Sequence, residues 1–422
     1  MRPLDRPLRI GIVGAGFISR FHLQSFLSIR DAQITAVASR TRKSAGSVAQ
    51  LARDLGVGDP TVHRDLGTLL TDPAVDAIWL LAPNFLRVEM VEEIADAARR
   101  GRTGIRALAI EKPLARNVRE ARRVVSEIRS TRLLHGYLEN IVFCPSVARP
   151  RDLLWARGAA RAGRPYLARA TEEHAGPHSP WFWRGKDQGG GVVNDMMCHS
   201  IECVRFLLSS PDPKDGPIVP KTVNAQIATL KWNRPEYAAE LKRRHGPSVD
   251  YRRTPSEDFG RASIAFADRE GRTLLAECSD SWCYVGAGLR TTIELQGPEY
   301  SMMVNTANAP TQIFLSRALG GQAAGEDFIE KQNSELGLMP VMEDETLTYG
   351  YVHENRHMVA AFRAGVPPKE TLDHGLLVTE LLMTCYMSAE KKKTLAFPPP
   401  GLEKFVPRSA MGRWNPSDIL KA

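Results

Sequence analysis

The segment from Leu8 to His22, LRIGIVGAGFISRFH, constrains the fold of this chain more than any other stretch. The apolar residues 10–13 predict a buried strand, and the glycine turn at 14–16 predicts a helix that begins near Phe17. Glycines in such a turn let the backbone approach a pyrophosphate, and the helix N-terminus offers it free N–H groups. Although Ser19 replaces the third glycine of a dinucleotide fingerprint, we expect a dinucleotide to contact Gly14, Gly16, Phe17 and Ile18.

The residues that follow alternate between apolar strands and amphipathic helices. Strands are expected at 34–38, 76–81, 107–110 and 133–137, and helices at 43–55, 88–100 and 118–129. Apolar rather than alternating strands, separated by helices, indicate a parallel sheet covered on both faces. We therefore expect residues 1–137 to form a doubly wound α/β dinucleotide-binding domain of the Rossmann type.

Beyond residue 138 the pattern changes to consecutive strands. They are expected at 166–172, 219–231, 261–266, 274–281, 290–296 and 311–315. The polar stretches 232–258 and 317–340 are expected to be surface loops or short helices, and two helices are expected at 353–364 and 375–391. Residues 138–422 are thus expected to form a second domain around an open, mainly antiparallel sheet.

Composition excludes several classes of function. A chain of 422 residues is long enough for two domains, and it contains no apolar run near the roughly 20 residues that span a bilayer. No secretory leader is recognisable, and the six cysteines form no CxxC pair, so we expect a cytoplasmic protein without disulfides. The net charge of +8 comes from arginines scattered among acidic residues, which favours a solvated surface over a nucleic-acid or membrane partner.

The end of the second expected strand bears on the choice of nucleotide. A site selective for NAD commonly has Asp or Glu there to bind the ribose 2′-hydroxyl, whereas this chain reads SRTRK at 39–43. Ser39, Arg40 and Lys43 can bind a 2′-phosphate instead, so NADP is favoured over NAD. The alternative is that Arg40 and Lys43 merely face solvent at the start of a helix.

A triple glycine at 189–191 precedes a stretch, 194–208, that is expected to be helical. Asp195 and His199 are four residues apart and would project from the same face of that helix. An imidazole beside a carboxylate can transfer a proton near neutral pH, because the carboxylate orients the ring and stabilises its cation. A purely structural hydrogen bond between the two side chains is the alternative.

Five motifs occur in an order that resembles the Gfo/Idh/MocA oxidoreductases, the family of glucose-fructose oxidoreductase and inositol dehydrogenase. They are GAG with a later histidine at 14–22, PN at 83–84, EKP at 111–113, GGGVVNDMMCH at 189–199 and DHGLLVTELLMTCYMSAEKKKTLAFP at 373–398. The resemblance covers residues 8–398 and implies that residues 138–422 form an α/β domain whose open sheet binds substrate and carries subunit contacts. Ser19, Met197 and Arg87 depart from the residues usual at those positions of the family.

The resemblance implies which groups carry the chemistry. Lys112 would bind the reacting oxygen, Asp195 and His199 would form the catalytic pair, and Pro113 would follow a cis peptide bond as in relatives. Pro83, Asn84 and Glu111 would line the nicotinamide and ribose. The expected reaction passes hydride between a nicotinamide and a secondary hydroxyl or ketone of a sugar, glycoside or cyclitol, without a metal, in a homodimer or homotetramer.

A polar and aromatic cluster precedes the triple glycine in the loop 172–188. Aromatic faces can stack on sugar C–H surfaces, and histidine and arginine can bind hydroxyls, so the loop predicts a wall of the saccharide site. The residues concerned are His174, His178, Trp181, Trp183 and Arg184. Aromatic packing beneath the loop is the alternative.

Three other functions remain open at the level of sequence. Transient oxidation of a sugar carbon could serve glycoside cleavage without net redox, and the same fold could act as a sugar or nucleotide sensor. His353-Glu354-Asn355-Arg356-His357 also spells the HExxH motif of zinc proteases, although chance matches to so short a pattern are common.

Overall fold

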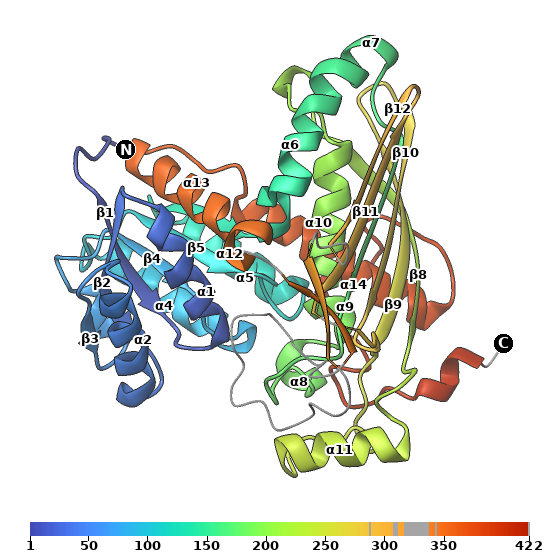
Figure 1. Cartoon of the computed structure of the whole chain (residues 1–422), viewed down its shortest axis with the longest axis horizontal. Helices are drawn as coiled ribbons and strands as arrows, with labels where there is room; N and C mark the ends of the chain where they lie inside the picture. Colours follow the sequence, from blue (N-terminus) through green and yellow to red (C-terminus); the bar gives the residue numbers. More distant parts are fainter. Residues whose placement is uncertain (287, 307–310, 316–336, 342–343, 421–422) are drawn as a thin grey trace. The chain divides into compact units, whose positions relative to one another are not determined.

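The structure is a computed structural model, and it describes residues 1–420 except 287, 307–310, 316–336 and 342–343 (Figure 1). The chain forms two compact units. The first comprises Met1–Cys144 and Thr346–Thr379, and the second comprises Pro145–Glu345 and Glu380–Ala422. Neither unit is therefore a single continuous stretch of sequence.

The first unit is built on a parallel sheet of six strands in the order β3-β2-β1-β4-β5-β6. The strands are β1 (Leu8–Val13), β2 (Ala32–Ala38), β3 (Thr61–His63), β4 (Ala77–Leu80), β5 (Ala107–Glu111) and β6 (Leu134–Leu138). The strand order reverses between β1 and β4, and ligands of such sheets bind outside the carboxyl ends of the strands at that point. The predicted doubly wound fold is confirmed.

Helices cover both faces of this sheet, which explains why its strands are apolar on both sides. In β4, Ile78 and Leu80 join one core cluster and Ala77 and Trp79 join the other. The helices from the first part of the chain are α1 (Phe17–Ser25), α2 (Arg42–Asp54), α3 (Leu66–Leu70), α4 (Arg87–Arg99) and α5 (Val118–Arg129).

One helix of the first unit, α13 (Tyr351–Ala364), comes from near the end of the chain. Its apolar side chains Met358, Val359 and Phe362 are buried in the core cluster formed by β1, α1 and α2. The sequence analysis assigned all of residues 138–422 to the second domain, and the structure instead places 138–144 and 346–379 with the first unit. The physical reason is this apolar face, which completes the core on one side of the sheet.

The second unit is built on a mixed sheet in the order β12-β11-β7-β10-β9-β8-β15, in which only β7 and β10 pair in parallel. Its strands are β7 (Leu167–Glu173), β8 (Val219–Ala228), β9 (Phe259–Ala267), β10 (Thr273–Ser281), β11 (Arg290–Gly297), β12 (Tyr300–Asn305) and β15 (Leu395–Ala396). Buried and exposed residues alternate along β8 to β11, so one face is packed and the other is open. The predicted open, mainly antiparallel sheet is confirmed.

Helix α10 (Met197–Leu208) packs on β7 and β10, and Figure 1 shows it running along one face of the sheet. The other helices of the second unit are α6 (Pro145–Leu153), a π-helical segment (Leu154–Ala159), α7 (Ala160–Ala162), α8 (Gly185–Gln188), α9 (Val192–Asp195) and α11 (Pro235–His245). Two helices belong to both units: α12 (Glu345–Thr348) enters the first unit after its first residue, and α14 (Leu372–Lys391) passes from the first unit to the second after Thr379. In a separate two-stranded sheet, β13 (Thr311–Leu315) pairs antiparallel with β14 (Gly337–Val341). Most of the insertion expected at 317–340 lies outside the described residues, and within the described chain no helix is long and apolar enough to cross a membrane.

Candidate active site

The glycine turn after β1 is shaped by close backbone contacts. Gly14 has a φ of +112°, and a Cβ atom there would lie 2.8 Å from backbone atoms of Leu81 and Ala82. Its N–H donates to the carbonyl of Ala38 at 2.9 Å, so the turn is tied to the carboxyl ends of β2 and β4. Only glycine can occupy this position without strain.

The N-terminus of α1 is open for an anion. Gly16 is its N-cap and supplies no side-chain acceptor, and a Cβ atom at Gly16 would contact nothing within 4 Å. Ser19, which replaces the third glycine, is fully buried and donates its hydroxyl to the carbonyl of Gly16 at 2.5 Å. The serine therefore fits the close packing that the fingerprint requires, and the turn suits a pyrophosphate.

The segment after β2 presents cations and no carboxylate. Thr41 caps α2 by accepting the N–H of Ser44 at 3.1 Å, and the hydroxyl of Ser44 donates to Ser39. Arg40 and Lys43 are exposed, and no acidic partner lies within ion-pair distance of either among the residues that the structure describes. Arg42, which the sequence analysis did not select, is equally exposed at the first position of α2.

The EKP turn follows β5. Glu111 is the last residue of the strand, and the Lys112–Pro113 peptide bond is cis as the resemblance implied. Lys112 is half-buried, whereas Glu111 is buried and accepts a hydrogen bond from Nε2 of His22 at 3.0 Å. Burial alone would raise the pKa of Glu111, but the contact with His22 holds it below its ordinary value.

Arg87, which the sequence analysis treated only as a departure from the family, holds the EKP turn in place. Its guanidinium is buried and donates to the carbonyls of Ala82 and Lys112 at 3.2 Å each, and also to the carbonyl of Pro113. The turn that carries Lys112 is thus fastened to the end of β4. Asn84, in the 3-10 turn that precedes α4, is also buried.

The HExxH segment has a structural role in the first unit. Asn355 accepts from Nε1 of Trp79 at 2.7 Å and donates to Nδ1 of His22 at 2.9 Å, which orients the histidine toward Glu111. Glu354 is completely buried, and burial together with neighbouring carboxylates raises its pKa well above the ordinary value. His357 accepts the N–H of Lys369 at 2.7 Å through Nε2. The motif therefore serves helix packing, because its acid is enclosed in the core and its second histidine is bonded to the backbone of Lys369.

In the second unit, the segment expected to be one helix is divided. Helix α9 ends at Asp195, Met196 lies between, and α10 begins at Met197. Asp195 and His199 are 3% and 5% exposed, so both side chains are held in a nearly water-free environment. Met197, which the sequence analysis noted as a departure from the family, is buried and packs near Gly260 of β9.

The loop before the triple glycine contains two kinds of side chain. Trp183 is only 2% exposed and packs against Trp232, Tyr251 and Trp282, with ring centroids 5.0, 5.4 and 5.1 Å away. His174 is fully buried, with Nδ1 accepting the N–H of Gly176 at 2.9 Å. For these two residues the structure favours aromatic and polar packing over a direct place in a saccharide wall.

The other members of the cluster are partly exposed. Trp181 stacks on Phe182 with ring centroids 3.8 Å apart, and His178 lies beside the same phenylalanine. Arg184 donates to Asp187 at 2.5 Å. These three residues retain surface that a ligand can reach.

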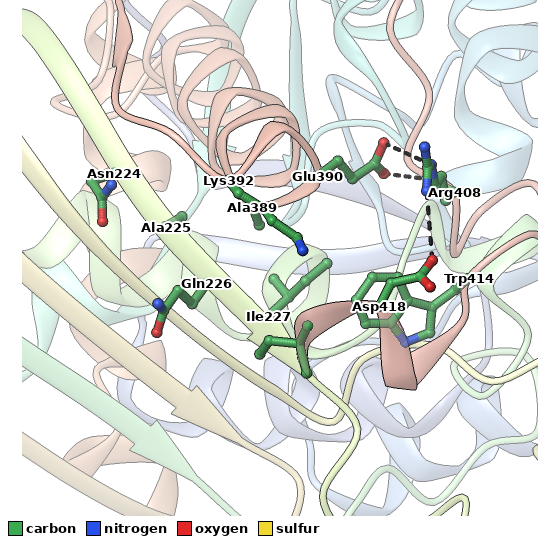
Figure 2. Close-up of a pocket in the computed structure, with 11 residues that line it drawn as sticks. Asn224, Ala225, Gln226, Ile227, Ala389, Glu390, Lys392, Arg408, Trp414 and Asp418 are labelled. Carbon is green, nitrogen blue, oxygen red and sulfur yellow. Dashed lines mark hydrogen bonds and ion pairs between the residues drawn. The ribbon is translucent and has the colours of Figure 1, made fainter. Parts of the chain in front are cut away.

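A pocket elsewhere in the second unit does not involve the predicted residues. Figure 2 shows it between β8, the end of α14 and the C-terminal segment. The volume of this pocket is about 180 Å³. Arg408 on its wall lies 3.7 Å from carboxylates of both Glu390 and Asp418. The charge of that arginine is therefore balanced within the pocket.

Comparison with known proteins gives consistent matches over both units. Residues 8–136 match the model of the oxidoreductase family with an NAD-binding Rossmann fold, and residues 158–301 match the GFO/IDH/MocA C-terminal domain. Levoglucosan dehydrogenase of Pseudarthrobacter phenanthrenivorans is 26% identical over 211 residues, 48% of this chain and 51% of that protein. Myo-inositol 2-dehydrogenase of Thermotoga maritima is 24% identical over 201 residues, 48% of this chain and 55% of that protein. The chain thus spans about half the length of the curated relatives that it matches.

Solved structures extend the similarity of fold to nearly the whole chain. GenD2 from gentamicin A biosynthesis, in complex with NAD, superposes with a TM-score of 0.72 at 21% identity, covering 94% of this chain and 99% of that one. Levoglucosan dehydrogenase in complex with NADH and levoglucosan gives a TM-score of 0.68 at 20% identity, covering 93% and 100%. The two family models, which together match well over half of the residues, show that the chain belongs to the GFO/IDH/MocA family of oxidoreductases with an NAD-binding Rossmann fold.

Proposed function

We propose that this protein is an NAD(P)-dependent dehydrogenase that transfers hydride between a nicotinamide and a secondary hydroxyl or ketone of a sugar, glycoside or cyclitol. The observation that carries the proposal is the position of Lys112 in the turn directly after β5, at the carboxyl end of the dinucleotide-binding sheet. Hydrogen bonds from Arg87 to the carbonyls of Ala82 and Lys112 hold this turn in place. Relatives named as levoglucosan and myo-inositol dehydrogenases support the substrate class.

The roles of the catalytic groups follow from their chemistry. In the oxidation, His199 would take the hydroxyl proton, Asp195 would orient the imidazole and stabilise its cation, and Lys112 would hydrogen-bond the same oxygen as its charge develops. The nicotinamide, when bound, supplies the acceptor for the hydride that leaves the carbinol carbon. The burial of Asp195 and His199 supports these roles, because a nearly dry site strengthens their electrostatic interaction.

The dinucleotide would bind at the glycine turn in the first unit. The uncapped N-terminus of α1 and the open space at Gly16 suit the pyrophosphate. Glu111, Pro83 and Asn84 would border the nicotinamide and its ribose. We propose NADP as the preferred form, because Arg40 and Lys43 are exposed cations at the end of β2, where a 2′-phosphate would lie, and Ser39 can donate a hydrogen bond to it.

Within the loop 172–188, the partly exposed residues are the better candidates for contact with the substrate. We propose that Trp181, His178 and Arg184 face the saccharide, and that Trp183 and His174 support the loop from beneath. The open face of the second sheet is proposed to form the contacts of a homodimer or homotetramer, which size-exclusion chromatography with light scattering would test.

The experiment that tests the function is a panel of sugars, glycosides and inositols assayed with NAD and NADP at 340 nm, with Lys112→Met as the comparison. Reduction of cofactor by wild type and its loss in the variant would support the proposal. Release of a cleaved product without any change of absorbance would indicate the alternative, glycoside cleavage through transient oxidation. Absence of both outcomes across the panel would contradict the proposal.

A further inference from the structure

The N-terminus of α9 bears directly on the proposed chemistry, because the helix ends at Asp195 and leads within four residues to His199. The first N–H groups of any helix have no acceptor within the helix itself. In α9 these groups belong to Gly191, Val192 and Val193, followed by Asn194. All four lie in the buried part of the second unit, so water cannot readily serve them.

Glu257, just before β9, serves three of the four groups. Its backbone carbonyl accepts the N–H of Val192 at 3.1 Å. Its side-chain Oε1 accepts the N–H of Gly191 at 2.6 Å and that of Val193 at 3.3 Å. A single residue thus caps α9 with both its main chain and its side chain.

Tyr386 of α14 serves the fourth group and joins the two caps. Its hydroxyl oxygen accepts the N–H of Asn194 at 3.2 Å and shares that of Gly191 at 3.1 Å. The same hydroxyl donates to Oε1 of Glu257 at 2.5 Å. Two residues that are 129 positions apart therefore satisfy every unpaired N–H at the start of α9.

The triple glycine is explained by the same contacts. A Cβ atom at Gly190, where φ is +149°, would lie 2.0 Å from Oη of Tyr386. A Cβ atom at Gly191 would lie 2.1 Å from the carbonyl oxygen of Glu257. The absence of side chains at these two positions is what lets Glu257 and Tyr386 reach the helix.

Both capping side chains are fully buried. Burial raises the pKa of Glu257 to about 7, against which the hydrogen bonds from Tyr386 and Gly191 act. Below that pH the carboxyl group is mainly neutral, so glutamine is a close substitute for it in shape and charge.

We propose that Glu257 and Tyr386 are positioning residues that fix the N-terminus of α9 and thereby set the places of Asp195 and His199. The inference rests on the proposed function, since it assigns both residues to the dehydrogenase chemistry of that pair. It assigns them no contact with substrate.

The kinetic test compares Tyr386→Phe, Glu257→Leu and Glu257→Gln with wild type. Phenylalanine removes the cap of Asn194, and leucine removes the side-chain cap of Gly191 and Val193, so we expect kcat to fall about 10-fold and up to about 100-fold with KM within about twofold. Glu257→Gln keeps an acceptor at Oε1, so its kcat at pH 6 should be close to that of wild type and well above that of Glu257→Leu. A merely structural role would not separate kcat from KM or be rescued in this way.

Asp268→Asn is the matched control. Asp268 is also a buried carboxylate that caps backbone N–H groups, those of Glu270 and Arg272 at 2.9 and 2.8 Å, but it lies at the turn between β9 and β10. We expect it to cost stability and leave kcat unchanged. Equal losses of kcat in Asp268→Asn and Tyr386→Phe would overturn the proposal.

A second measurement does not depend on activity. The ring ¹⁵N resonances of His199, assigned by their loss in His199→Asn, should shift in Tyr386→Phe and Glu257→Leu but stay in place in Asp268→Asn. Resonances that stay in place in folded Tyr386→Phe would overturn the proposal. If Glu257→Leu does not fold, the test relies on Tyr386→Phe, which is the milder substitution. Shifted resonances in a protein that reduces no cofactor would support the positioning role while contradicting the proposed function.

Discussion

Replacing Trp183 tests whether this buried side chain stabilises the loop before the triple glycine. Trp183 is 2% exposed, packs on three aromatic rings and donates Nε1–H to the carbonyl of Pro177 at 2.9 Å. Truncating a buried tryptophan to alanine costs about 3–5 kcal/mol through lost burial and the remaining cavity. Since domains are stable by only about 5–15 kcal/mol, Trp183→Ala should leave the second unit marginally stable.

Trp183→Phe is the more informative change. Phenylalanine keeps most of the packing and loses the hydrogen bond to Pro177, for which we expect a cost of about 1–2 kcal/mol. Urea unfolding followed by near-ultraviolet circular dichroism would measure the free energy of unfolding of both variants. KM for the substrate should be unchanged in Trp183→Phe, because the ring lies beneath the loop.

Trp181→Ala provides the contrast in the same loop. Trp181 is partly exposed and stacks on Phe182, so we expect its loss to change stability little. If it stacks on the sugar, KM should rise by about 2- to 10-fold, the equivalent of roughly 0.5–1.5 kcal/mol for an aromatic contact. The reasoning would be refuted if Trp183→Phe raised KM with no loss of stability while Trp181→Ala left KM unchanged.

Four further changes test the remaining groups. Lys112→Met should lower kcat about 100- to 10,000-fold in the 340 nm assay, because the reacting oxygen loses its hydrogen-bond donor; retention of kcat would contradict the role of this lysine. Replacing Arg40 and Lys43 with alanine should raise KM for NADP about 10-fold or more and spare KM for NAD, since only the former has a 2′-phosphate; equal changes would argue against the proposed preference. Arg87→Met should lower the free energy of unfolding by about 2–3 kcal/mol, measured by calorimetry, and should also lower kcat, because three carbonyls lose their donor. A loss of stability with unchanged kcat would restrict the role of Arg87 to packing. The pKa of Glu257 is raised from 4.5 to about 7 in the fold, so the stability that its protonated form contributes is complete below pH 4.5 and is lost as pH rises through 7. We expect the free energy of unfolding to fall by about 3 kcal/mol over this range. Urea titrations at several pH values would measure this dependence, which Glu257→Gln should remove.

The parallel sheet was predictable because its signals are local. Apolar runs such as DAIWLL and ALAI identify buried strands, and the glycine turn locates the nucleotide site from a few adjacent residues. The short elements β3 and α3 were not anticipated, since three to five residues carry too little periodicity. The antiparallel sheet was also predicted in outline, although its order depends on pairings between distant strands.

Parts of the candidate site depend on contacts that no local pattern contains. Arg87 was identified only as a departure from the family, because its three carbonyl acceptors lie in two separate turns. Trp183 was grouped with Trp181, since two tryptophans in one loop look alike until the partners at 232, 251 and 282 are known. The break at Met196 was missed because the hydrophobic pattern continues through it.

Residues 346–379 belong to the first unit although they are synthesised after most of the second, which affects how the chain can fold during translation. Asn355 binds His22, Ser25 and Trp79 across more than 270 positions of sequence. A ribosome must therefore translate strands β7 to β12 of the second sheet before α13 emerges and the nucleotide-binding core can be completed. Until then, the nascent chain exposes the patch of β1, α1 and α2 that α13 will cover, a surface on which a chaperone could act.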